Sequence, residues 1–469
     1  MSESPSSSLT VRADIAARIG NFGRVMAAIG ETGAEVGGVD IVRSTSSTVT
    51  RDITIHVRDA AHGASVVDAL NGLEGVRVRS ANDRVMLAHA GGKMTMRNRA
   101  ALESRDDLSM AYTPGVARVC MAIHHDPERT WDLTIRGNSV AVITDGSSVV
   151  GRGDLGPLAA LPSAEAKCMF LREMAGIDGF PLPLTVRDTA EIANVVTKIT
   201  SVFAGVHLTD MAAPRCFEVQ RVLAEALDIP VLHDHQAGSS AAVLAGLING
   251  FGLVGKQLGD ATVVIAGAGP TGVATARLLI AAGVGQVIAC KSDGAVHAGR
   301  QFDRPELTWL AENTNPDRRD GDVNALVRGA DAFIGISKPD ILTADAVRSM
   351  AKDPIVFALA MPQPEISPSD AAGVAAVYAT GRPDLPNQIN SSLGFPGMWR
   401  GLLDCRATRL DDTMVLAAAR AIAETSAGSV TPEHVVPSVL NPDLVPNVAR
   451  AVRAAAESSG AARLTGSVV

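Results

Sequence analysis

Aromatic residues are scarce in this chain, at 3% of 469 residues, and charged residues make up only 20%. A disordered chain would carry more charge and fewer aliphatic residues, so wholesale disorder is excluded, and the core has to be built from Ala, Val, Leu and Ile. An excess of basic residues is also lacking, because the formal net charge is -8. No whole-chain attraction to nucleic acid or to an anionic membrane is therefore expected.

Cysteines are few and far apart in the sequence, and an odd number cannot pair completely: Cys120, Cys168, Cys216, Cys290 and Cys405. No zinc-type spacing occurs, which favours reduced, buried thiols in a cytoplasmic protein. The first residues lack the basic and apolar blocks of a signal peptide. The most apolar long stretch, residues 237–255, is interrupted by serine, glycine and asparagine, which predicts a buried helix rather than a membrane span.

Residues 1–90 are predicted to form a separate α+β domain. Strand-like and helix-like segments follow one another in the order β-α-β-β-α-β, from Leu9–Asp14 to Val76–Ser80, which is the split unit of ferredoxin-like folds. With the glycine-containing loop at residues 18–23, this domain resembles the small regulatory ACT type. A dimerisation module without a ligand fits the same pattern, so both interpretations stay open.

After a linker, short apolar strands alternate with helices in residues 97–235 and again in residues 236–469. Such alternation is typical of α/β architectures with parallel sheets. We expect two α/β lobes here, the second of which ends in alanine-rich helices.

The sharpest short motif begins the second of these lobes. A β-branched strand (Ala261–Ala266) runs directly into Gly267-Ala-Gly269-Pro-Thr271-Gly272 and then into a helix. In this GxGxxG pattern the first glycine permits a tight turn, the second lets the backbone approach a pyrophosphate, and the third lets the helix pack on the strand. The motif predicts a Rossmann-like NAD(P) site.

The end of the next strand bears on the choice of nucleotide. Lys291 and Ser292 stand where an acidic residue would bind the ribose hydroxyls of NAD, and Asp293 follows them. A cation suits the 2′-phosphate of NADP, so NADP is slightly favoured. In the other interpretation Lys291 points to solvent and Asp293 binds the ribose.

Longer motifs are spread in order over most of the chain after residue 97. They are Asp107–Ala117 (DLSMAYTPGVA), Thr144–Gly146, Gly151–Pro157, Ala175–Asp178, Ala213–Glu218, His233–Gly238, Gly381–Asn390 and Phe395–Gly397. Together they resemble the bacterial malic enzymes, which convert malate to pyruvate and CO2 with NAD(P) and a divalent metal. The N-terminal domain resembles the ACT-like extension of some members.

The resemblance implies roles for three residues. Lys167 matches the lysine that takes the hydroxyl proton of the 2-hydroxy acid, and Asp234 matches the carboxylate that holds this lysine. Tyr112 matches the tyrosine that returns a proton to the enolate. Asn390 falls in a segment that contacts the nucleotide or the substrate. The resemblance also implies a homodimer or a larger homo-oligomer.

The metal positions depart from the family pattern. Two of the three carboxylate ligands are replaced, by Thr209 and His235, and only Asp210 is kept. A hard ion such as Mg2+ prefers oxygen ligands, so its site is weakened, although Asp210 with His235 suits Mn2+, Fe2+ or Zn2+. In the other interpretation the metal is absent, and His235 serves as a hydrogen-bond donor or as a cation at the substrate oxygen.

The substrate positions depart as well. Met361 replaces a family asparagine, Ser391 replaces another, and Arg152 stands where a leucine is usual. If residues 148–152 are extended, Arg152 faces the same side as Ser148 and can bind a carboxylate; a surface arginine is the other interpretation.

These observations predict an NAD(P)-dependent oxidoreductase that decarboxylates malate or a related 2-hydroxy acid, with a possible effector at the ACT-like domain and no nucleic-acid or membrane partner. Two alternatives remain open: a catalytically relict nucleotide-binding regulator, and a non-decarboxylating 2-hydroxy acid dehydrogenase without the usual metal.

Overall fold

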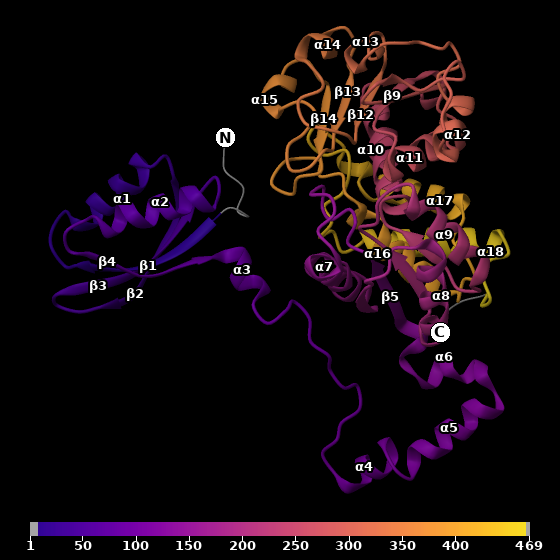
Figure 1. The fold of residues 1–469 in the computed structure, drawn as a ribbon, viewed down its shortest axis with the longest axis horizontal. Helices are drawn as coiled ribbons and strands as arrows, with labels where there is room; N and C mark the ends of the chain where they lie inside the picture. Colours follow the sequence, from indigo (N-terminus) through magenta and orange to yellow (C-terminus); the bar gives the residue numbers. More distant parts are fainter. Residues whose placement is uncertain (1–7, 466–469) are drawn as a thin grey trace. The chain divides into compact units, whose positions relative to one another are not determined.

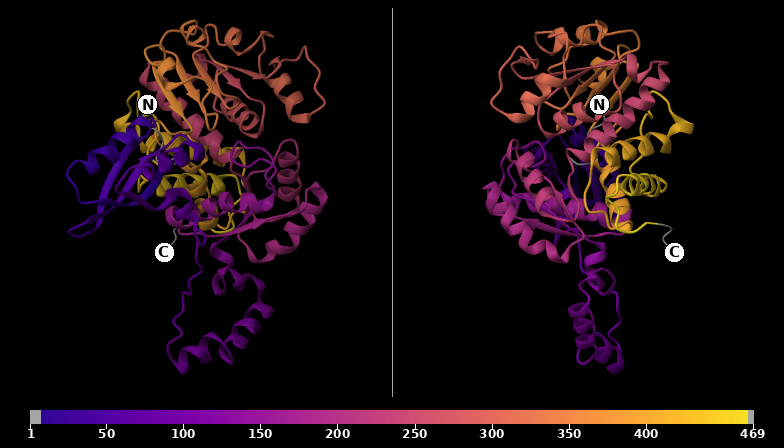
Figure 2. Two further views of the ribbon diagram at one scale, coloured as in Figure 1. Left: turned by 60° about the vertical axis from the view of Figure 1, so that its left-hand side comes forward. Right: turned by 90° about the vertical axis from the view of Figure 1, so that its right-hand side faces the viewer.

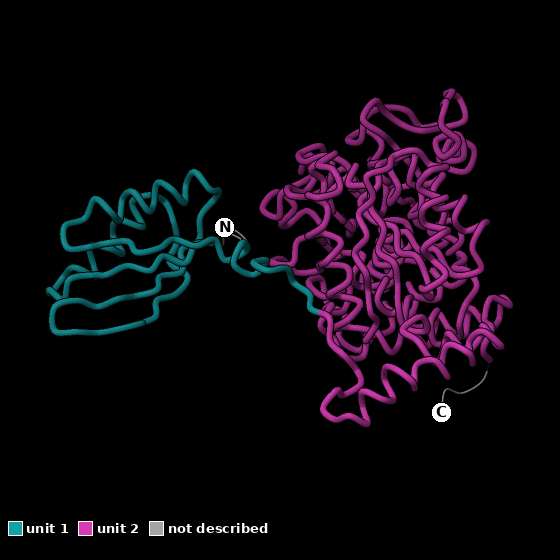
Figure 3. The backbone as a smooth tube through the Cα atoms, turned by 60° about the horizontal axis from the view of Figure 1, so that its bottom comes forward, with its two compact units in different colours: residues 1–95 teal, residues 96–469 magenta. Residues whose placement is uncertain are grey.

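The structure, a computed structural model, describes residues 8–465. The chain divides into two compact units, residues 1–95 and residues 96–469, which Figure 3 draws in teal and magenta. Each unit is described by itself below.

Unit 1 is a four-stranded antiparallel sheet with the strand order β2-β3-β1-β4. Figure 1 shows helices α1 and α2 over one face of this sheet, where they enclose a core that includes Val11, Val25, Ile53 and Val66. The order of the elements is the expected β-α-β-β-α-β, followed by a short helix: β1 (Ser8–Ala16), α1 (Asn21–Glu31), β2 (Glu35–Ser44), β3 (Thr48–His56), α2 (Ala60–Asn71), β4 (Val76–Asp83) and α3 (Arg84–His89).

Unit 2 begins with two short helices, α4 (Arg105–Ala111) and α5 (Gly115–His125), that lie away from the rest of the unit in the views of Figures 1 and 2. We call residues 97–125 the arm. None of the described residues of α4 and α5 is buried. The arm instead exposes large apolar side chains, namely Leu102, Leu108, Met110, Tyr112, Val116 and Met121. Such a concentration of apolar surface marks an interaction site.

The first lobe of unit 2 is a parallel sheet with the order β6-β5-β7-β8. Its central strand, β5, is buried along its whole length, as expected for a parallel strand that has helices on both faces. Its elements are α6 (Thr130–Leu133), β5 (Ser139–Thr144), α7 (Pro157–Ala175), β6 (Asp178–Pro183), α8 (Thr189–Ile199), β7 (Gly205–Leu208), α9 (Arg215–Ala226) and β8 (Val231–His233).

The second lobe is a six-stranded sheet with the order β11-β10-β9-β12-β13-β14, parallel apart from the short edge strand β11. The long helix α10 enters this lobe and is buried over most of its length. The elements are α10 (Ala237–Leu253), β9 (Thr262–Ala266), α11 (Pro270–Ala281), β10 (Gln286–Lys291), β11 (Gly294–Ala295), α12 (Pro305–Asn313), α13 (Val323–Leu326), β12 (Ala332–Gly335), α14 (Ala344–Arg348), β13 (Ile355–Ala358), α15 (Pro368–Ala371) and β14 (Val377–Thr380).

The C-terminal helices return to the first lobe. Helix α17 (Asp412–Thr425) packs on α10, while α16 (Phe395–Asp404) packs on α7 and on α18 (Leu444–Ser458). In α16 the buried Trp399 donates its indole N–H to Nδ1 of His207 on β7, at 2.9 Å. Among residues 8–465, no helix is long and apolar enough to cross a membrane.

The expectation of an extended chain at residues 148–152 is wrong. The segment turns, and Val150 has a positive φ of 45°. A strand needs negative φ values, so the condition under which Arg152 would face the same side as Ser148 is not met.

The contact between β7 and α16 leaves no room for a side chain at Gly205, whose Cβ would strike the ring of Trp399. We expect Gly205→Ala to lower the free energy of unfolding by about 1–3 kcal/mol, the usual cost of overpacking. Gly252→Ala is the matched control, because nothing lies within 4 Å of that position in α10. It should raise stability by up to about 1 kcal/mol through helix propensity. Equal thermal unfolding midpoints for the two variants would contradict this packing.

Candidate active site

A cleft of about 470 Å³ lies within unit 2 and is lined by residues of both lobes. Lys167, Asp210 and His235 come from the first lobe or its junction with α10, and Gly269, Thr271 and Ser391 come from the second. Asp210 directly follows β7, and Asp234 with His235 directly follows β8. Because β7 and β8 are parallel neighbours, their carboxyl ends bring these side chains to one edge of the sheet.

Lys167 and Asp234 form the central ion pair of the cleft. Lys167 Nζ contacts Asp234 Oδ2, and the Asp234 side chain is fully buried while that of Lys167 is 17% exposed. Lys167 Nζ also donates to Ser391 Oγ at 3.4 Å, and Ser391 Oγ donates to Asp234 Oδ2 at 3.3 Å. Burial opposes the ionised form of Asp234, but the charges of His235 and Lys167 outweigh it and hold its pKa well below the usual range.

His235 lies beside two carboxylates and faces the cleft. Its Nε2 is 3.7 Å from Asp234 Oδ1 and 3.9 Å from Asp210 Oδ1, and its side chain is 41% exposed. These are ion-pair distances and too long for hydrogen bonds. The charge of Asp234 raises the pKa of His235 against the opposing effect of burial.

Two further histidines lie behind the cleft, fully buried. Burial lowers the pKa of His207 to about 4 and that of His233 to about 3, so both rings are neutral at neutral pH. Because His207 Nδ1 accepts a hydrogen bond from Trp399, the proton of its ring is on Nε2. These two buried rings support the residues that line the cleft and do not line it themselves.

The glycine turn between β9 and α11 has the geometry that its motif predicts. Gly267 has a φ of 126°, and a Cβ there would strike the carbonyl of Ile336. A Cβ on Gly272 would strike the carbonyl of Gly267, whereas nothing lies within 4 Å of the Cβ position of Gly269. The turn therefore leaves open space at Gly269 at the N-terminus of α11, which suits a pyrophosphate. Gly269, Thr271 and Gly272 line the same cleft as Lys167, so the residues present fit NAD(P).

At the end of β10, Lys291 does not point freely into solvent. Its Nζ pairs with Asp293 Oδ2 at 2.5 Å, and Arg300 Nη2 reaches the same oxygen at 3.0 Å. The hydrogen bond from Lys291 lowers the pKa of Asp293, with a smaller contribution from Arg300. Two cations thus share one carboxylate where the resemblance places the adenosine ribose.

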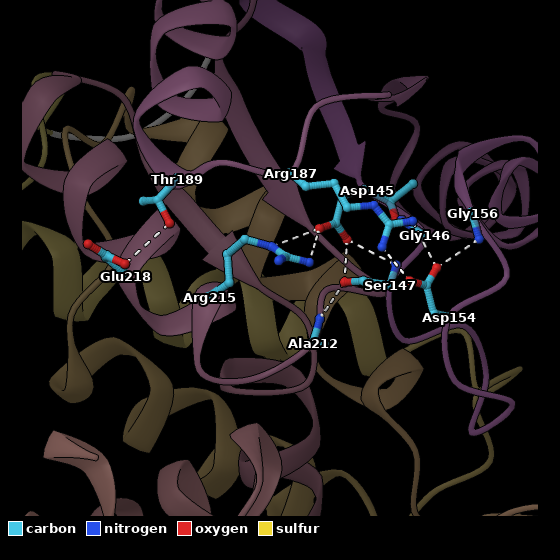
Figure 4. A network of polar contacts seen from close by, with 11 residues as sticks. Asp145, Gly146, Ser147, Asp154, Gly156, Arg187, Thr189, Ala212, Arg215 and Glu218 are labelled. Carbon is cyan, nitrogen blue, oxygen red and sulfur yellow. Dashed lines mark hydrogen bonds and ion pairs between the residues drawn. The ribbon is translucent and has the colours of Figure 1, made fainter. Parts of the chain in front are cut away.

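Buried charges also fix the loop that carries Ser148, Val150 and Gly151 into the cleft (Figure 4). Asp145 is fully buried and accepts two hydrogen bonds from Arg215 on α9, at 2.9 and 2.6 Å, and one from the hydroxyl of Ser147. Farther along the loop, Asp154 pairs with Arg187. The sequence motif Thr-Asp-Gly at residues 144–146 was the signal for this network, but a structural role for Asp145 was not predicted.

Eight predicted site residues line the cleft together with Lys167: Asp210, His235, Gly269, Thr271, Gly272, Met361, Asn390 and Ser391. Arg152 is exposed and is absent from the described lining, because the turn at Val150 directs the chain away from an extended path. Tyr112 is 66% exposed on the arm and does not line the cleft of its own chain either. Ser163 and Ser239 line the cleft and were missed.

The residues around Asp210 do not fit a divalent metal ion. Among the described residues, no group of three or more His, Cys, Asp or Glu side chains is arranged to hold one. Asp234 is already paired with Lys167, and Thr209 brings a neutral hydroxyl where a carboxylate would be needed. Asp210 is the one acidic residue among those that line the cleft, which is too little negative charge for a hard dication.

Two family models match almost all of unit 2: "Malic enzyme, N-terminal domain" over residues 92–224 and "Malic enzyme, NAD binding domain" over residues 236–457. The chain belongs to the malic enzyme family. It is 44% identical to an NAD-dependent malic enzyme of Geobacillus stearothermophilus over 97% of this chain and 95% of that protein. It is 43% identical to a bifunctional malic/malolactic enzyme of Bacillus subtilis over 80% of this chain and 92% of that one.

Solved malic enzymes share the fold of unit 2. The enzyme of Pyrococcus horikoshii matches with a TM-score of 0.76 and 40% identity, over 80% of this chain and 89% of that chain. The NAD-dependent malic enzyme of Thermotoga maritima matches with a TM-score of 0.76 and 36% identity, over 79% and 99%. The family and the malic-enzyme α/β architecture with an NAD-binding domain are thus confirmed, while the ACT-like character of unit 1 stays a prediction.

The glycine turn gives a matched pair of variants. We expect Gly269→Ala to leave folding intact and to weaken NAD(P) binding about tenfold or more, because the added methyl group occupies the open space at the turn. Gly272→Ala should instead lower the thermal unfolding midpoint, since its Cβ meets the backbone of Gly267. Calorimetric titration and thermal unfolding separate the two effects. Unchanged nucleotide affinity in a folded Gly269→Ala variant would contradict the assigned turn.

Proposed function

We propose that this malic enzyme family member oxidises and decarboxylates malate, or a closely related 2-hydroxy acid, with NAD(P). The observation that carries the proposal is that Lys167, which is paired with the buried Asp234, lines the same cleft as the glycine turn. Neither a relict regulator nor a non-decarboxylating dehydrogenase is favoured by the similarity to named malic enzymes.

Lys167 is the base in this proposal. In its neutral form, Nζ takes the proton from the 2-hydroxyl group as the C2 hydrogen leaves, and the carboxylate of Asp234 stabilises the ammonium that forms. Ser391 holds both partners in place through its hydroxyl. Bound at the turn formed by Gly269 and Thr271, the nicotinamide nucleotide supplies the hydride acceptor.

The acid binds between the two lobes. Asn390 and Ser391 are the polar groups that face it from the second lobe, whereas Met361 presents an apolar side chain where the family resemblance has an amide. We therefore expect this chain to bind the second carboxylate of the acid differently from other members of the family, with a strength set by the polar groups Asn390 and Ser391. For the nucleotide, the two cations Lys291 and Arg300 support a preference for NADP.

The test is turnover by the full chain with malate and either nucleotide, followed by the absorbance of the reduced nicotinamide and by assay of pyruvate. We expect pyruvate and reduced nucleotide in equal amounts. Lys167→Ala should lower kcat by about 10²- to 10⁴-fold with nucleotide affinity unchanged. Lys198→Ala, an exposed lysine on α8, is the matched control and should keep the full rate. Nucleotide binding without oxidation of any 2-hydroxy acid would instead favour a regulator.

The acid that protonates the enolate is Tyr112, and in this proposal it comes from a second copy of the chain. Within one chain the phenol is exposed on the arm, next to several exposed apolar side chains. An arm that inserts beside the cleft of a partner covers this surface and completes the site. In a symmetric dimer the exchange is mutual, which supports a homodimer as the working form.

Mixing two inactive variants tests the exchanged arm. Tyr112→Phe lacks the acid and Lys167→Ala lacks the base, so each homodimer is inactive. In a mixed dimer one of the two sites has both groups, and random reassortment should restore about a quarter of the wild-type rate. No recovery, with mixed dimers shown to form by differently sized tags, would place Tyr112 in the cleft of its own chain or outside the reaction.

Two further assignments complete the proposal. All five cysteines are free, and burial raises the pKa of Cys168, Cys216 and Cys290 to about 12, which supports a cytoplasmic location. Unit 1 is assigned a regulatory or dimerisation role; it contains a cavity of about 430 Å³ between α2 and strands β1 and β4, large enough for a small effector.

A further inference from the structure

The surroundings of His235 differ from those that a divalent metal requires. A hard ion such as Mg2+ is bound by several oxygen ligands, with carboxylates supplying the charge. Here the backbone that follows β7 offers Thr209, which is fully buried, and then Asp210. The backbone that follows β8 offers Asp234 and His235. Only one of these four side chains is a carboxylate that lines the cleft.

Asp234 is unsuited to a metal because Lys167 is already bonded to it. Its Oδ2 accepts from Ser391 and pairs with Lys167 Nζ. A divalent ion on the same carboxylate would lie within a few ångströms of Lys167 Nζ and would oppose the ammonium that forms when Lys167 takes the proton of the substrate. At that separation two positive charges repel each other by several kcal/mol at an effective dielectric constant of about 20.

The imidazole of His235 takes up the space between the two carboxylates. Its Nε2 lies at 3.7 Å from Asp234 Oδ1 and at 3.9 Å from Asp210 Oδ1. The ring is partly exposed, and both His235 and Lys167 line the cleft. His235 thus approaches one oxygen of the Asp234 carboxylate, Oδ1, while Lys167 pairs with the other, Oδ2, so a substrate oxygen that reaches Lys167 would also lie near this ring.

We propose that this enzyme works without a divalent metal and that the side chain of His235 donates a hydrogen bond to the 2-oxygen of the substrate in place of the ion. This inference rests on the proposed function. His235 is then a catalytic residue, Asp210 positions its ring, and Thr209 fills a buried site with a neutral group.

The step in which the donor matters is the loss of CO2. After C2 has lost its hydrogen as hydride to the nicotinamide and the hydroxyl proton has passed to Lys167, C2 carries a carbonyl group. The bond between C3 and the leaving carboxylate breaks, CO2 departs, and the electron pair of that bond forms the enolate, whose charge lies on the 2-oxygen. Protonation of C3 by Tyr112 then gives the 2-oxo acid. A donor aimed at the 2-oxygen lowers the barrier to this charge development.

Metal dependence tests the first half of the proposal. The full chain is treated with a chelator, and malate turnover is then measured with and without Mn2+, alongside calorimetric titration of the chain with Mn2+ alone. We expect the two rates to agree within twofold and no stoichiometric binding. Activation by Mn2+ of more than tenfold, or binding of one ion per chain, would overturn it.

The second half of the proposal, the hydrogen bond from His235, is tested by substituting this histidine. His235→Ala should lower kcat by about 10²- to 10³-fold, the usual effect of losing one such donor, with a much smaller change in KM and in nucleotide affinity. His89→Ala, on α3 of unit 1, is the matched control for loss of a histidine. An unchanged kcat in His235→Ala would remove this residue from the reaction.

A variant with restored carboxylate ligands should depend on the metal, unlike the wild-type chain. The double variant Thr209→Glu/His235→Asp supplies two carboxylates beside Asp210, so Mn2+ should bind in the calorimeter and turnover should become metal-dependent. Failure of this variant to bind Mn2+ while folded would contradict the account of the donor set. If the wild-type chain oxidises no acid under any condition, the proposed function fails, whereas the calorimetric result with Mn2+ still decides whether this chain has a metal site.

Discussion

The buried ion pair between Lys167 and Asp234 is the constraint on which the cleft depends. A fully buried carboxylate is costly to ionise, and it stays charged here because a lysine and a histidine lie beside it. Removing one partner of such a pair typically costs about 3–5 kcal/mol, because the other charge is left uncompensated. Since Lys167 lies on α7, Asp234 follows β8 and Ser391 belongs to the second lobe, one contact network joins three parts of unit 2.

The neighbours of the pair follow from the same sheet. Parallel strands β7 and β8 end side by side, so Asp210 and His235 have to lie near Asp234. The loop after β5 is held by the buried Asp145–Arg215 pair. The carboxylates at the edge of the sheet therefore lie beside the positive charge of Lys167 and the imidazole of His235, although Thr209 Oγ1 and Asp210 Oδ2 are buried without a hydrogen-bond partner. A divalent cation would add positive charge here, and that is why the donor set and the position of His235 lead to the same conclusion.

The sequence predicted the nucleotide turn well because its determinants are local. A strand, three glycines and a helix follow one another within about 20 residues. A Cβ at Gly267 or Gly272 would strike the backbone, and the position beside Gly269 is open. Lys167 and Asp234 lie far apart in the sequence, so no spacing rule pairs them, and only the resemblance to malic enzymes did so. The structure brings the two side chains into contact, with Lys167 lining the cleft and Asp234 fully buried beside it.

Two expectations depended on information that a single segment does not contain. The carboxylate-binding role of Arg152 required an extended segment, but Val150, Gly151 and Gly153 have positive φ values and form a turn, and Arg152 does not line the cleft. Tyr112 sits in a motif that resembles the catalytic motif of the family, yet within one chain its side chain is 66% exposed on the arm, so the proposed role requires a second copy of the chain. A local sequence motif identifies such a residue, but the side chains that surround it are set by the folded structure.

The most direct test of the central claim is chemical rescue of the base. Lys167→Ala should lose malate oxidation, and small primary amines such as methylamine, added at increasing concentration, should restore it, because the amine replaces Nζ as proton acceptor beside Asp234. The account predicts recovery that saturates with amine and is absent in Lys198→Ala, which has nothing to recover. A Lys167→Ala variant that keeps most of its activity, or that binds nucleotide and acid but gains nothing from any amine, would contradict it.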